Sequence, residues 1–224
     1  MKSLFGIVSC DVIESTSLER ETWIQLRKDI NNQLFRDIGV VCPDSWGRVV
    51  RGDTIECCLE KCWLSFRVAL MIKCWFMEWA SLHHAAAGMR EAGVRYSIGI
   101  GTMRVIDHEM DLMDGPAIYM AGRNLDRMAG GRSNSCFEME TNYDDVNALI
   151  DNSLTFVDRI VEQATARQVP ILYSRLMGRT ENEIASRQII SQGAVNQRAK
   201  SAGWPFIKYT LNLLEHINYD RYVE

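Results

Sequence analysis

Two aspartates in this sequence end strand-like segments, and together they can bind a divalent cation. Asp11 ends an apolar run that begins at residue 3, and Asp53 follows Gly52 within RVVRGDTIECCLE, residues 48–60. Two carboxylates a few ångströms apart repel each other unless a proton or a cation lies between them. Mg²⁺ commonly binds one or two carboxylates and completes its shell with water and substrate phosphates. The pair therefore indicates a site for Mg²⁺ or Mn²⁺ and phosphate chemistry, if the fold brings the two residues together.

The apolar periodicity and the turn residues predict the element order β-α-β-β-α-β-α-β, followed by an entirely helical tail from about residue 144. Thr16 and Glu19 fit a capping box that opens the first helix. Residues 108–115 are expected to form a polar loop, and Pro116 begins the third helix. The expected strands are residues 3–12, 48–51, 54–60, 94–105 and 135–140, and the expected helices are residues 17–37, 62–88 and 116–129.

This element order has a consequence for the two aspartates. A β-α-β crossover makes the first two strands parallel within one sheet, and a tight hairpin makes the third strand antiparallel to the second. If the third strand lies between the first two, Asp11 at the end of strand one lies beside Asp53 at the hairpin tip. The simpler interpretation of each residue alone is a hairpin turn or a cap, but the topology favours a shared cation site.

The composition indicates a globular protein with a sizeable core. The chain has 224 residues, 47% of them hydrophobic, and a net charge of −4. This charge argues against a surface built for non-specific nucleic-acid binding, although it allows a local basic patch. The seven cysteines, without a secretory signal, are expected to be reduced and buried. We expect a cytoplasmic protein.

The apolar run of residues 62–82 is long, but Arg67, Lys73 and Glu78 interrupt it. Charged residues at these positions favour a helix covered by the core or by a partner chain over a membrane span. The sequence therefore predicts no membrane partner.

Several short motifs resemble known families. DVIEST (11–16), RGDTIECC (51–58) and RYSIGIGTM (95–103) resemble elements of class III nucleotide cyclases, and the last two together with DGPAIYMAGRNLD (114–126) are similar to the SatD family of bacterial proteins. The resemblance implies an α+β fold: a ferredoxin-like (cyclase/palm) βαββαβ sheet with helices on one face, followed by a small all-α helix-turn-helix domain. The implied domains are residues 1–146 and 147–224.

The cyclase resemblance also implies roles for residues around the hairpin. Asp11 and Asp53 would bind the metal ions, Mg²⁺ or Mn²⁺. Ser15, Thr16 and Gly52 would bind a nucleoside triphosphate, with the two hydroxyl residues near a helix N-terminus suited to phosphate. The alternative for Ser15 and Thr16 is a purely structural capping role.

On the helix of residues 116–129, four-residue spacing places Tyr119 and Arg123 on one face. Arg123 matches the family's catalytic Arg, which reaches the substrate in a partner subunit and so implies a homodimer. Tyr119 replaces the family's Asn, and Val49 replaces the Lys that helps to select the base. These two departures argue against ordinary cyclase activity. A solvated surface arginine is the alternative for Arg123.

Two further features concern packing around this helix. Ile118, Gly122, Leu125 and Ala129 are expected to form its core stripe and to leave Arg123 off it. Gly99 and Gly101 within residues 94–105 lack side chains, so we expect another backbone or a ligand to approach them closely.

The segment TENEIASRQIISQGAVNQRAKSAGW, residues 180–204, predicts helix, short turn and helix. Ile184 and Ala185 would pack against Val195 and Ala199, and Ser191 would cap the second helix. Residues of the second helix suited to contacts with double-stranded DNA are Gln192, Asn196, Gln197, Arg198 and Lys200.

The turn between these helices contains a departure from the usual pattern. Ile189 stands where Gly is usual, and a β-branched residue resists positive φ, so a different turn or a shifted register is expected. A helical appendage used for dimer contacts is the alternative to a DNA reader.

Three hypotheses for function follow. The leading one is a regulatory protein whose palm domain binds a nucleoside triphosphate with Mg²⁺ and whose helix-turn-helix binds DNA. The second is an active nucleotide cyclase or nucleotidyl transferase that uses two metal ions. The third is a non-catalytic, dimeric interaction module.

Overall fold

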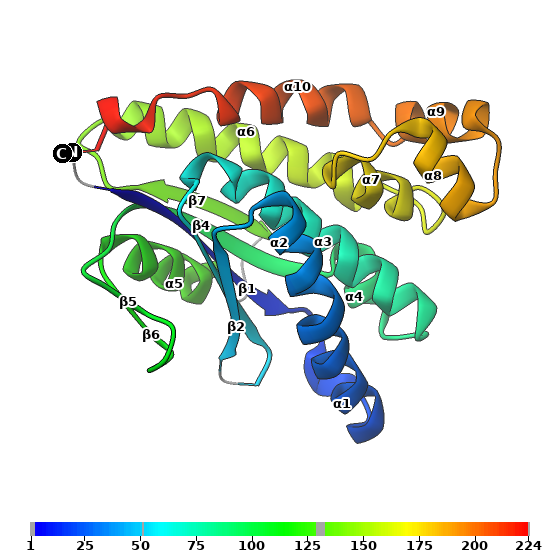
Figure 1. Cartoon of the computed structure of the whole chain (residues 1–224), viewed down its shortest axis with the longest axis horizontal. Helices are drawn as coiled ribbons and strands as arrows, with labels where there is room; N and C mark the ends of the chain where they lie inside the picture. Colours follow the sequence, from blue (N-terminus) through cyan, green and yellow to red (C-terminus); the bar gives the residue numbers. More distant parts are fainter. Residues whose placement is uncertain (1–2, 51, 129–132, 224) are drawn as a thin grey trace.

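A five-stranded mixed sheet lies at the centre of the protein, in the strand order β2-β3-β1-β4-β7 (Figure 1). The structure is a computed structural model that describes residues 3–50, 52–128 and 133–223. The strands are β1 (Leu4–Val12), β2 (Ser45–Val50), β3 (Thr54–Leu59), β4 (Val94–Thr102) and β7 (Ser135–Met139). All five expected strands are present, and the expectation of a mixed α+β fold is confirmed.

The strand β3 lies between β1 and β2 and is antiparallel to both, as the sequence predicted. Asp11 is opposite Thr54 in the register of β1 and β3. The backbone N–H of Val12 donates to the carbonyl of Asp53 at 3.4 Å. On its other edge β1 pairs with β4 in an antiparallel manner, and β7 is parallel to β4. The end of β1 therefore lies beside the tip of the β2–β3 hairpin.

The segment between β1 and β2 forms a long helix with a π turn in its middle. It consists of α1 (Arg20–Asp29), the π turn (Ile30–Leu34) and α2 (Phe35–Val41). The capping box expected at Thr16 is wrong, because α1 begins after Glu19, whose side chain makes no cap. Residues Ser15–Ser17 form a 3₁₀ turn instead, since both the N–H and the hydroxyl of Ser17 donate to the carbonyl of Glu14.

The helix α3 (Ser65–Leu82) lies between the sheet and the C-terminal helices, and 14 of its 18 residues are buried. The apolar run is thus covered by the chain's own core: Trp75 and Trp79 are buried, although Trp63 just before α3 is 41% exposed. The expected single helix of 62–88 is wrong at its end, because α4 (Ala87–Ala92) is separate. Within the described parts of the chain, no helix combines the length and the hydrophobicity needed to cross a bilayer.

The helix α5 (Pro116–Met128) lies on the opposite face of the sheet from α3 (Figure 1). There Ala117 and Ala121 pack with Ile7 of β1 in a cluster separate from the main core. The expectation of helices on one face is therefore wrong for α5. A β-carbon on Gly99 would lie 2.2 Å from the carbonyl oxygen of Ala117, which confirms the close backbone approach predicted for this glycine. Gly101 meets side chains instead, with Glu140 and Met120 nearest.

The face of α5 that packs on the sheet also differs from the expected stripe. Its buried residues are Ala117, Met120, Ala121, Asn124, Leu125 and Met128. Ile118 and Gly122, expected in the core, are only half-buried, and Ala129 lies outside the described residues. The expected loop of 108–115 belongs to a small hairpin, formed by β5 (Val105–Asp107) and β6 (Leu112–Asp114).

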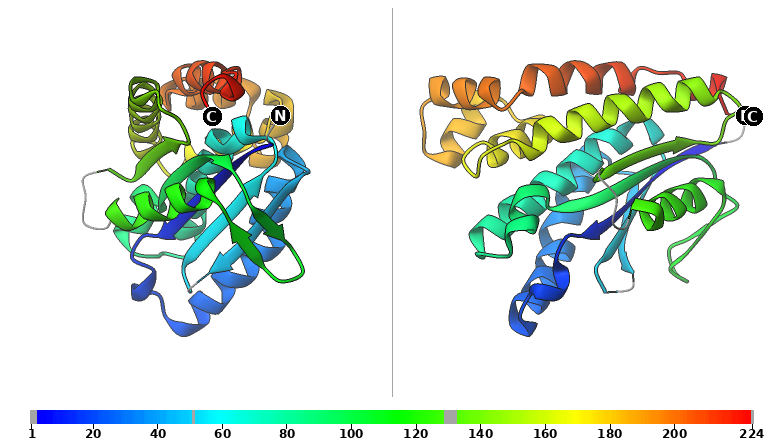
Figure 2. Two further views of the ribbon diagram at one scale, coloured as in Figure 1. Left: turned by 90° about the vertical axis from the view of Figure 1, so that its left-hand side faces the viewer. Right: turned by 180° about the vertical axis from the view of Figure 1, so that it is seen from behind.

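After β7 the described residues form the α-helices α6 (Asp144–Glu162), α7 (Val169–Leu176), α8 (Glu181–Gln188), α9 (Gln192–Ser201) and α10 (Trp204–Glu215), followed by a 3₁₀ turn (Tyr219–Arg221). α6 packs on β7, α7 packs on α3, and α10 lies along α6 (Figure 2). One hydrophobic cluster contains Phe66 and Phe137 together with Leu154 and Leu211. The core is thus continuous across residues 146 and 147, and the domain boundary expected there stays a prediction.

The helices α8 and α9 pack as expected. Ile184, Val195 and Ala199 form one buried cluster with Ile171 of α7. The hydroxyl of Ser191 accepts a hydrogen bond from the N–H of Ala194, so the predicted cap of α9 is confirmed. The sequence predicted that the turn would change so as to avoid a positive φ at Ile189. This prediction is wrong, because Ile189 itself adopts the left-handed conformation, with φ 52°. Packing of α8 on α9 therefore overrides the local preference of this residue.

Candidate functional site

Asp11 lies on the sheet face that α5 partly covers. Alternation along β1 puts it on the same face as Ile7 and Ser9, and Ile7 packs against α5. Its Oδ1 accepts a hydrogen bond from Thr54 Oγ1 at 2.9 Å, and its Oδ2 lies 3.7 Å from Arg95 Nη2. The hydroxyl of Thr54 thus orients the carboxylate of Asp11, and the guanidinium of Arg95 forms only a long ion pair with it.

Asp53 lies at the hairpin tip, where Gly52 has φ 86° and makes the turn possible. Its Oδ2 accepts a hydrogen bond from Ser15 Oγ at 2.5 Å. Arg27 of α1 donates to the carbonyl of Gly52 at 2.9 Å and so attaches the tip to the helix. Asp11 and Asp53 are both placed at one end of the sheet, as predicted.

A cavity of about 460 Å³ lies between the hairpin tip and the start of α1, and we name it the tip cavity. Its lining residues are Ser15, Thr16, Leu18, Arg20, Trp23, Gly52 and Asp53. The structure therefore brings together three of the four residues predicted to bind a nucleotide, Arg123 being the exception, and one of the two predicted metal ligands. Arg20 was missed by the sequence reasoning, although it is the one cation among residues 11–23 and follows the predicted phosphate loop.

A second cavity, of about 570 Å³, lies between the sheet and α5, and we name it the sheet cavity. Its lining residues are Ser9, Asp11, Arg48, Val50, Thr54, Glu56, Met113, Ile118, Tyr119, Gly122, Arg123, Leu125 and Asp126. Asp11, Tyr119 and Arg123 thus line one space within a single chain. The predicted site residues are divided between two cavities, with Asp11 facing one and Asp53 the other.

Tyr119 is held by its neighbours on the rim of the sheet cavity. Its hydroxyl donates to the carboxylate of Asp114 and accepts a hydrogen bond from Arg104 at 2.7 Å. Arg104 also pairs with Asp114 at 2.6 Å. Arg123 is exposed, and the described residues offer it no hydrogen bond or ion pair. Of the two, only Arg123 is free to contact a ligand.

An ion pair on the hairpin was also missed. Arg48 of β2 bonds to Glu56 of β3 at 2.7–2.8 Å, and the two are directly opposite in register. The strand period of two would have identified them, because Arg48, Thr54 and Glu56 share one face of the hairpin. Val49 lies on the other face, where it packs against the main core. The residue in place of the family's Lys therefore has no access to the sheet cavity.

The aspartate pair, Asp11 and Asp53, provides the oxygen ligands that Mg²⁺ prefers. Among the described residues no group of three or more His, Cys, Asp or Glu side chains is clustered for a metal ion. Two hydroxyls add to the donor set: Ser9 and Ser97 face each other in register, and both Oγ atoms are buried without a hydrogen-bond partner in the described structure. Because buried polar atoms normally have partners, the hydroxyl of Ser9, which lines the sheet cavity, fits a ligand or water there.

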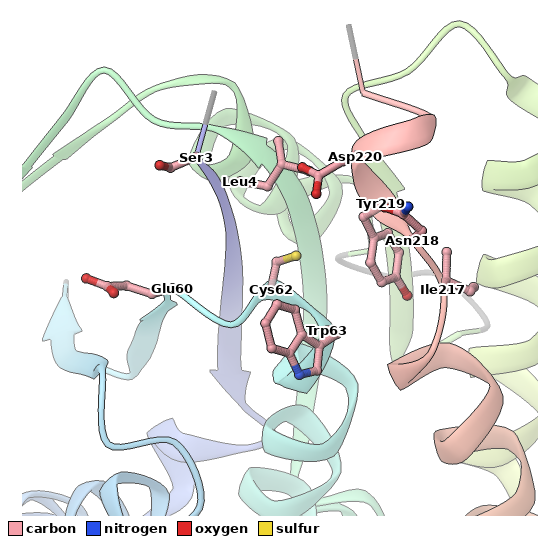
Figure 3. Close-up of a pocket in the computed structure, with 9 residues that line it drawn as sticks. All are labelled: Ser3, Leu4, Glu60, Cys62, Trp63, Ile217, Asn218, Tyr219 and Asp220. Atoms are coloured by element: carbon pink, nitrogen blue, oxygen red, sulfur yellow. The ribbon is translucent and has the colours of Figure 1, made fainter. Parts of the chain in front are cut away.

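A cavity of about 440 Å³ lies at the other end of β1, between the start of that strand and the C-terminal residues (Figure 3). Its walls include Glu60, Trp63 and Asp220, and Figure 3 shows Glu60 pointing away from the rest. Burial, with a contribution from Asp220, raises the pKa of Cys62 to about 11, which makes this thiol a poor nucleophile. This cavity contains no residue that the sequence singled out for function.

The surface of α9 matches the prediction from the sequence in most positions. Gln192, Asn196, Gln197 and Lys200 are exposed, whereas Arg198 is half-buried. Their exposure leaves the predicted contacts with DNA sterically open.

No protein-family profile matches the chain, and no curated protein matches it significantly. Two solved structures of a bacterial light-regulated adenylyl cyclase show a distant likeness. The first has a TM-score of 0.42 and 14% identity over 61% of this chain and 76% of the cyclase chain. The second has a TM-score of 0.41 and 14% identity over 61% of this chain and 43% of the other.

Proposed function

We propose that this protein is a regulatory protein of the SatD family, in which a ferredoxin-like, cyclase-type palm binds a nucleoside triphosphate with Mg²⁺. In this proposal residues 147–224 bind double-stranded DNA through a helix-turn-helix, and the protein is a homodimer. The observation that carries the proposal is the tip cavity, which joins Ser15, Thr16, Gly52 and Asp53 although 35 or more residues separate the first two from the last two.

The tip cavity has the chemistry of a phosphate site. Ser15 and Thr16 supply hydroxyls, and Arg20 supplies a guanidinium at the first position of α1. The free N–H groups in the first turn of a helix of this length favour an anion. Trp23 gives the cavity an aromatic wall against which a planar base can pack.

In this proposal Asp53, which lines the tip cavity, would hold the divalent ion beside the phosphate site, and Asp11 at the adjacent end of β1 would complete the pair by turning its carboxylate towards Asp53. When bound, such an ion neutralises charge on the phosphate oxygens. Thr54 and Ser15 hold the two carboxylates through hydroxyl donors, which leave other carboxylate lone pairs available. Arg95 at 3.7 Å from Asp11 supplies positive charge when no metal is bound.

Two observations, one in the sheet cavity and one on the opposite face of the hairpin, favour binding over catalysis. The hydroxyl of Tyr119 is already engaged by Asp114 and Arg104, and Val49 faces the core. The position of the family's Asn and the position of the Lys that helps to select the base therefore both lack a free polar group. A nucleotide that is bound but not turned over suits a regulatory signal.

The proposal is tested by calorimetric titration of the purified protein with each ribonucleoside triphosphate in Mg²⁺ or Mn²⁺. We expect saturable binding that requires the metal, and at least a tenfold loss of affinity in Asp53→Asn. Asp44→Asn is the matched control, because Asp44 is half-exposed and lines neither cavity. Absence of metal-dependent binding for all four nucleotides contradicts the proposal. Chromatography of the same mixtures tests the alternative, since a cyclic or linked product identifies an active cyclase or nucleotidyl transferase.

The DNA-binding part of the proposal rests on the exposed face of α9. Substituting Lys200 is expected to weaken binding to all sequences and to reduce its salt dependence, because lysine contacts phosphates. Substituting Asn196 or Gln197 is expected to change sequence preference instead. Fluorescence anisotropy with promoter fragments, over a range of salt concentrations, distinguishes these outcomes. A wild-type protein that binds no fragment at low salt excludes the DNA reader.

Exposed apolar side chains on two neighbouring helices favour a second candidate, the dimeric interaction module. Its residues are Leu149 and Phe156 on α6 and Phe206, Tyr209 and Leu213 on α10, each more than half exposed. Sedimentation velocity at micromolar concentration tests for a dimer, with Phe156→Ser as the variant. A monomer at these concentrations argues against both the dimer and the contact predicted between Arg123 and a partner's aspartate pair.

A further inference from the structure

A separate cavity of about 230 Å³ lies between α3, α7 and α10, far in sequence from the aspartate pair. Its lining residues are Arg67, Arg175, Gly178, Arg179, Trp204, Lys208 and Asn212. Four of these residues are cationic and none is acidic. The tip and sheet cavities share no lining residue with it. We name it the basic cavity.

Three helices contribute to the basic cavity in a regular way. Trp204, Lys208 and Asn212 follow one another at four-residue intervals, so they form a stripe on one face of α10. Arg175 lies in the last turn of α7, and Arg179 lies three positions beyond its last residue, Leu176. Arg67 of α3 completes the wall of the basic cavity.

Carboxylates outside the cavity fix two of the guanidiniums. Arg67 donates from Nε and Nη2 to Glu215 at 2.7 and 2.9 Å, and from Nη1 to the carbonyl of Leu176 at 3.1 Å. A guanidinium has five N–H donors, so two donors of Arg67 remain. Arg175 pairs with Glu181 through Nη2 at 2.5 Å. Both cations are thus held in place before any ligand arrives.

Several donors around the cavity have no acceptor, or only a distant one. Nε of Arg175 is buried and has no hydrogen-bond partner among the described residues. Arg179 reaches Ser174 Oγ only at 3.4 Å. Lys208 is exposed, and no ion pair to it occurs in the described structure. A buried donor without an acceptor marks the place of a missing acceptor.

Two other carboxylates lie near Arg179 without lining the cavity. Burial raises the pKa of Glu78, and the charge of Arg179 lowers it in part. Glu183 belongs to the capping box of α8, where hydrogen bonds from Thr180 lower its pKa. The inner surface of the cavity therefore remains cationic.

We infer that the basic cavity binds a small phosphate-type oxyanion, such as a phosphomonoester or a pyrophosphate group. Guanidiniums match the geometry of phosphate oxygens and bind them with short, charge-assisted hydrogen bonds. The side chains of Arg67 and Arg175 are only 19% and 16% exposed, so a small anion reaches them and the backbone of a rigid duplex does not. An anion bound here would contact residues of α3, of α10 and of the end of α7. In the chain, α8 and α9 lie between α7 and α10.

The test is titration with sodium pyrophosphate at constant ionic strength, followed by calorimetry and by ³¹P NMR. EDTA is present throughout, so that the metal-dependent nucleotide site proposed above stays empty. Failure of the basic cavity to bind pyrophosphate is then distinguishable from failure of that nucleotide site. We expect saturable binding with one site per chain. The double variant Arg179→Gln, Lys208→Gln is expected to lose affinity at least tenfold. Arg187→Gln is the matched control, because it removes one exposed cation from α8 outside the cavity.

Circular dichroism verifies that the double variant is folded, and Lys208→Glu alone replaces it if it is not, because Lys208 is exposed. Two results overturn the inference: no saturable binding to the wild type, or an affinity that the cavity variants leave unchanged. Displacement of pyrophosphate by an equimolar short DNA duplex also overturns it, because the anion recognised is then a backbone phosphate of DNA.

Discussion

Two groups of carboxylates in this protein have opposite surroundings. In the Lys73 cluster, Asp158 and Glu162 of α6 both bond to the ammonium of Lys73 at 2.8–2.9 Å, and Lys73 is fully buried. In the aspartate pair, Asp11 and Asp53 line cavities and are held mainly by hydroxyls. Carboxylates neutralised within the core can serve only packing. Carboxylates held by hydroxyls keep the capacity to bind an external cation.

The pKa directions in the Lys73 cluster agree with this contrast. Burial raises the pKa of Asp158, and Lys73 offsets part of the rise. Burial alone would also raise the pKa of Glu162, but Lys73 and the amide of Asn134 lower it below its ordinary value. Lys73 is therefore the group that makes two buried carboxylates tolerable.

Removal of the ammonium is the largest perturbation that we predict. Lys73→Met is expected to lower the free energy of unfolding by about 3–5 kcal/mol, because it leaves Asp158 buried without a counter-ion. In this variant the pKa of folded Asp158 lies further above that of the unfolded chain, so the folded state binds the proton more tightly. The deficit should therefore shrink as the pH falls from 7 towards 5. Urea denaturation at several pH values measures both effects.

Two variants control this experiment. Lys28→Met on the surface of α1 should change stability by no more than about 0.5 kcal/mol. Asp158→Leu added to Lys73→Met should recover much of the loss, because it removes the unpaired carboxylate. Equal stability of Lys73→Met and wild type would mean that the Lys73 cluster is not a structural ion pair.

The aspartate pair should respond in the opposite way. Asp11→Asn with Asp53→Asn is expected to leave the free energy of unfolding within about 0.5 kcal/mol of wild type, or to raise it slightly, because like charges are removed. The affinity for nucleotide with Mg²⁺ should fall by about 10–100-fold, which corresponds to about 1.4–2.7 kcal/mol. Thermal unfolding and calorimetric titration measure the two quantities. A large loss of stability without loss of affinity would assign the pair a structural role.

A second buried contact tests whether other carboxylates that are paired within the core also contribute to stability, as we predict for the Lys73 cluster. The hydroxyl of Tyr173 on α7 donates to Asp37 of α2 at 2.8 Å, and both side chains are buried. Tyr173→Phe should cost about 1–3 kcal/mol, because it leaves a buried carboxylate oxygen without this donor. Tyr209→Phe is the control, since Tyr209 is 67% exposed. Urea denaturation of the two variants side by side gives the difference.

The smallest predicted effect is a gain. Ile189 has φ 52° and is 91% exposed, so its own side chain contributes no packing that would be lost on substitution. Ile189→Gly should stabilise the protein by about 0.5–1 kcal/mol, because relief of left-handed strain exceeds the entropy cost of glycine. Ile190→Gly, at a half-buried position of the same turn, should destabilise it instead. The midpoints of thermal unfolding decide between the two signs.

The sequence predicted the central part of the fold because local signals and topology agreed there. The Gly52-Asp53 turn, the period of β3 and the crossover after β1 together placed Asp11 beside the hairpin tip. The side of the sheet that α5 covers depends on packing around Gly99, which no local signal encodes. For the same reason the sequence did not reveal that the predicted site residues line two cavities.

Competing local contacts explain the remaining errors. Thr16 and Glu19 match a capping box, but the bonds of Ser17 to Glu14 form a 3₁₀ turn first and delay the start of α1. Ile189 disfavours its own conformation by about 1–2 kcal/mol, yet the burial of Ile184 against α9 outweighs this cost. A local contact therefore decided the start of α1, and tertiary packing decided the turn at Ile189.

The continuous core has a consequence for synthesis on the ribosome. Phe66 of α3 contacts both Phe137 of β7 and Tyr219 near the end of the chain, with ring centroids 5.3 and 6.4 Å apart. Arg67 bonds to Glu215, a residue 148 positions later. A nascent chain that has released only the sheet thus exposes the apolar face of α3 until the C-terminal helices emerge. We therefore expect α3, and with it the sheet that it covers, to reach its final packing only after the helical tail has been translated.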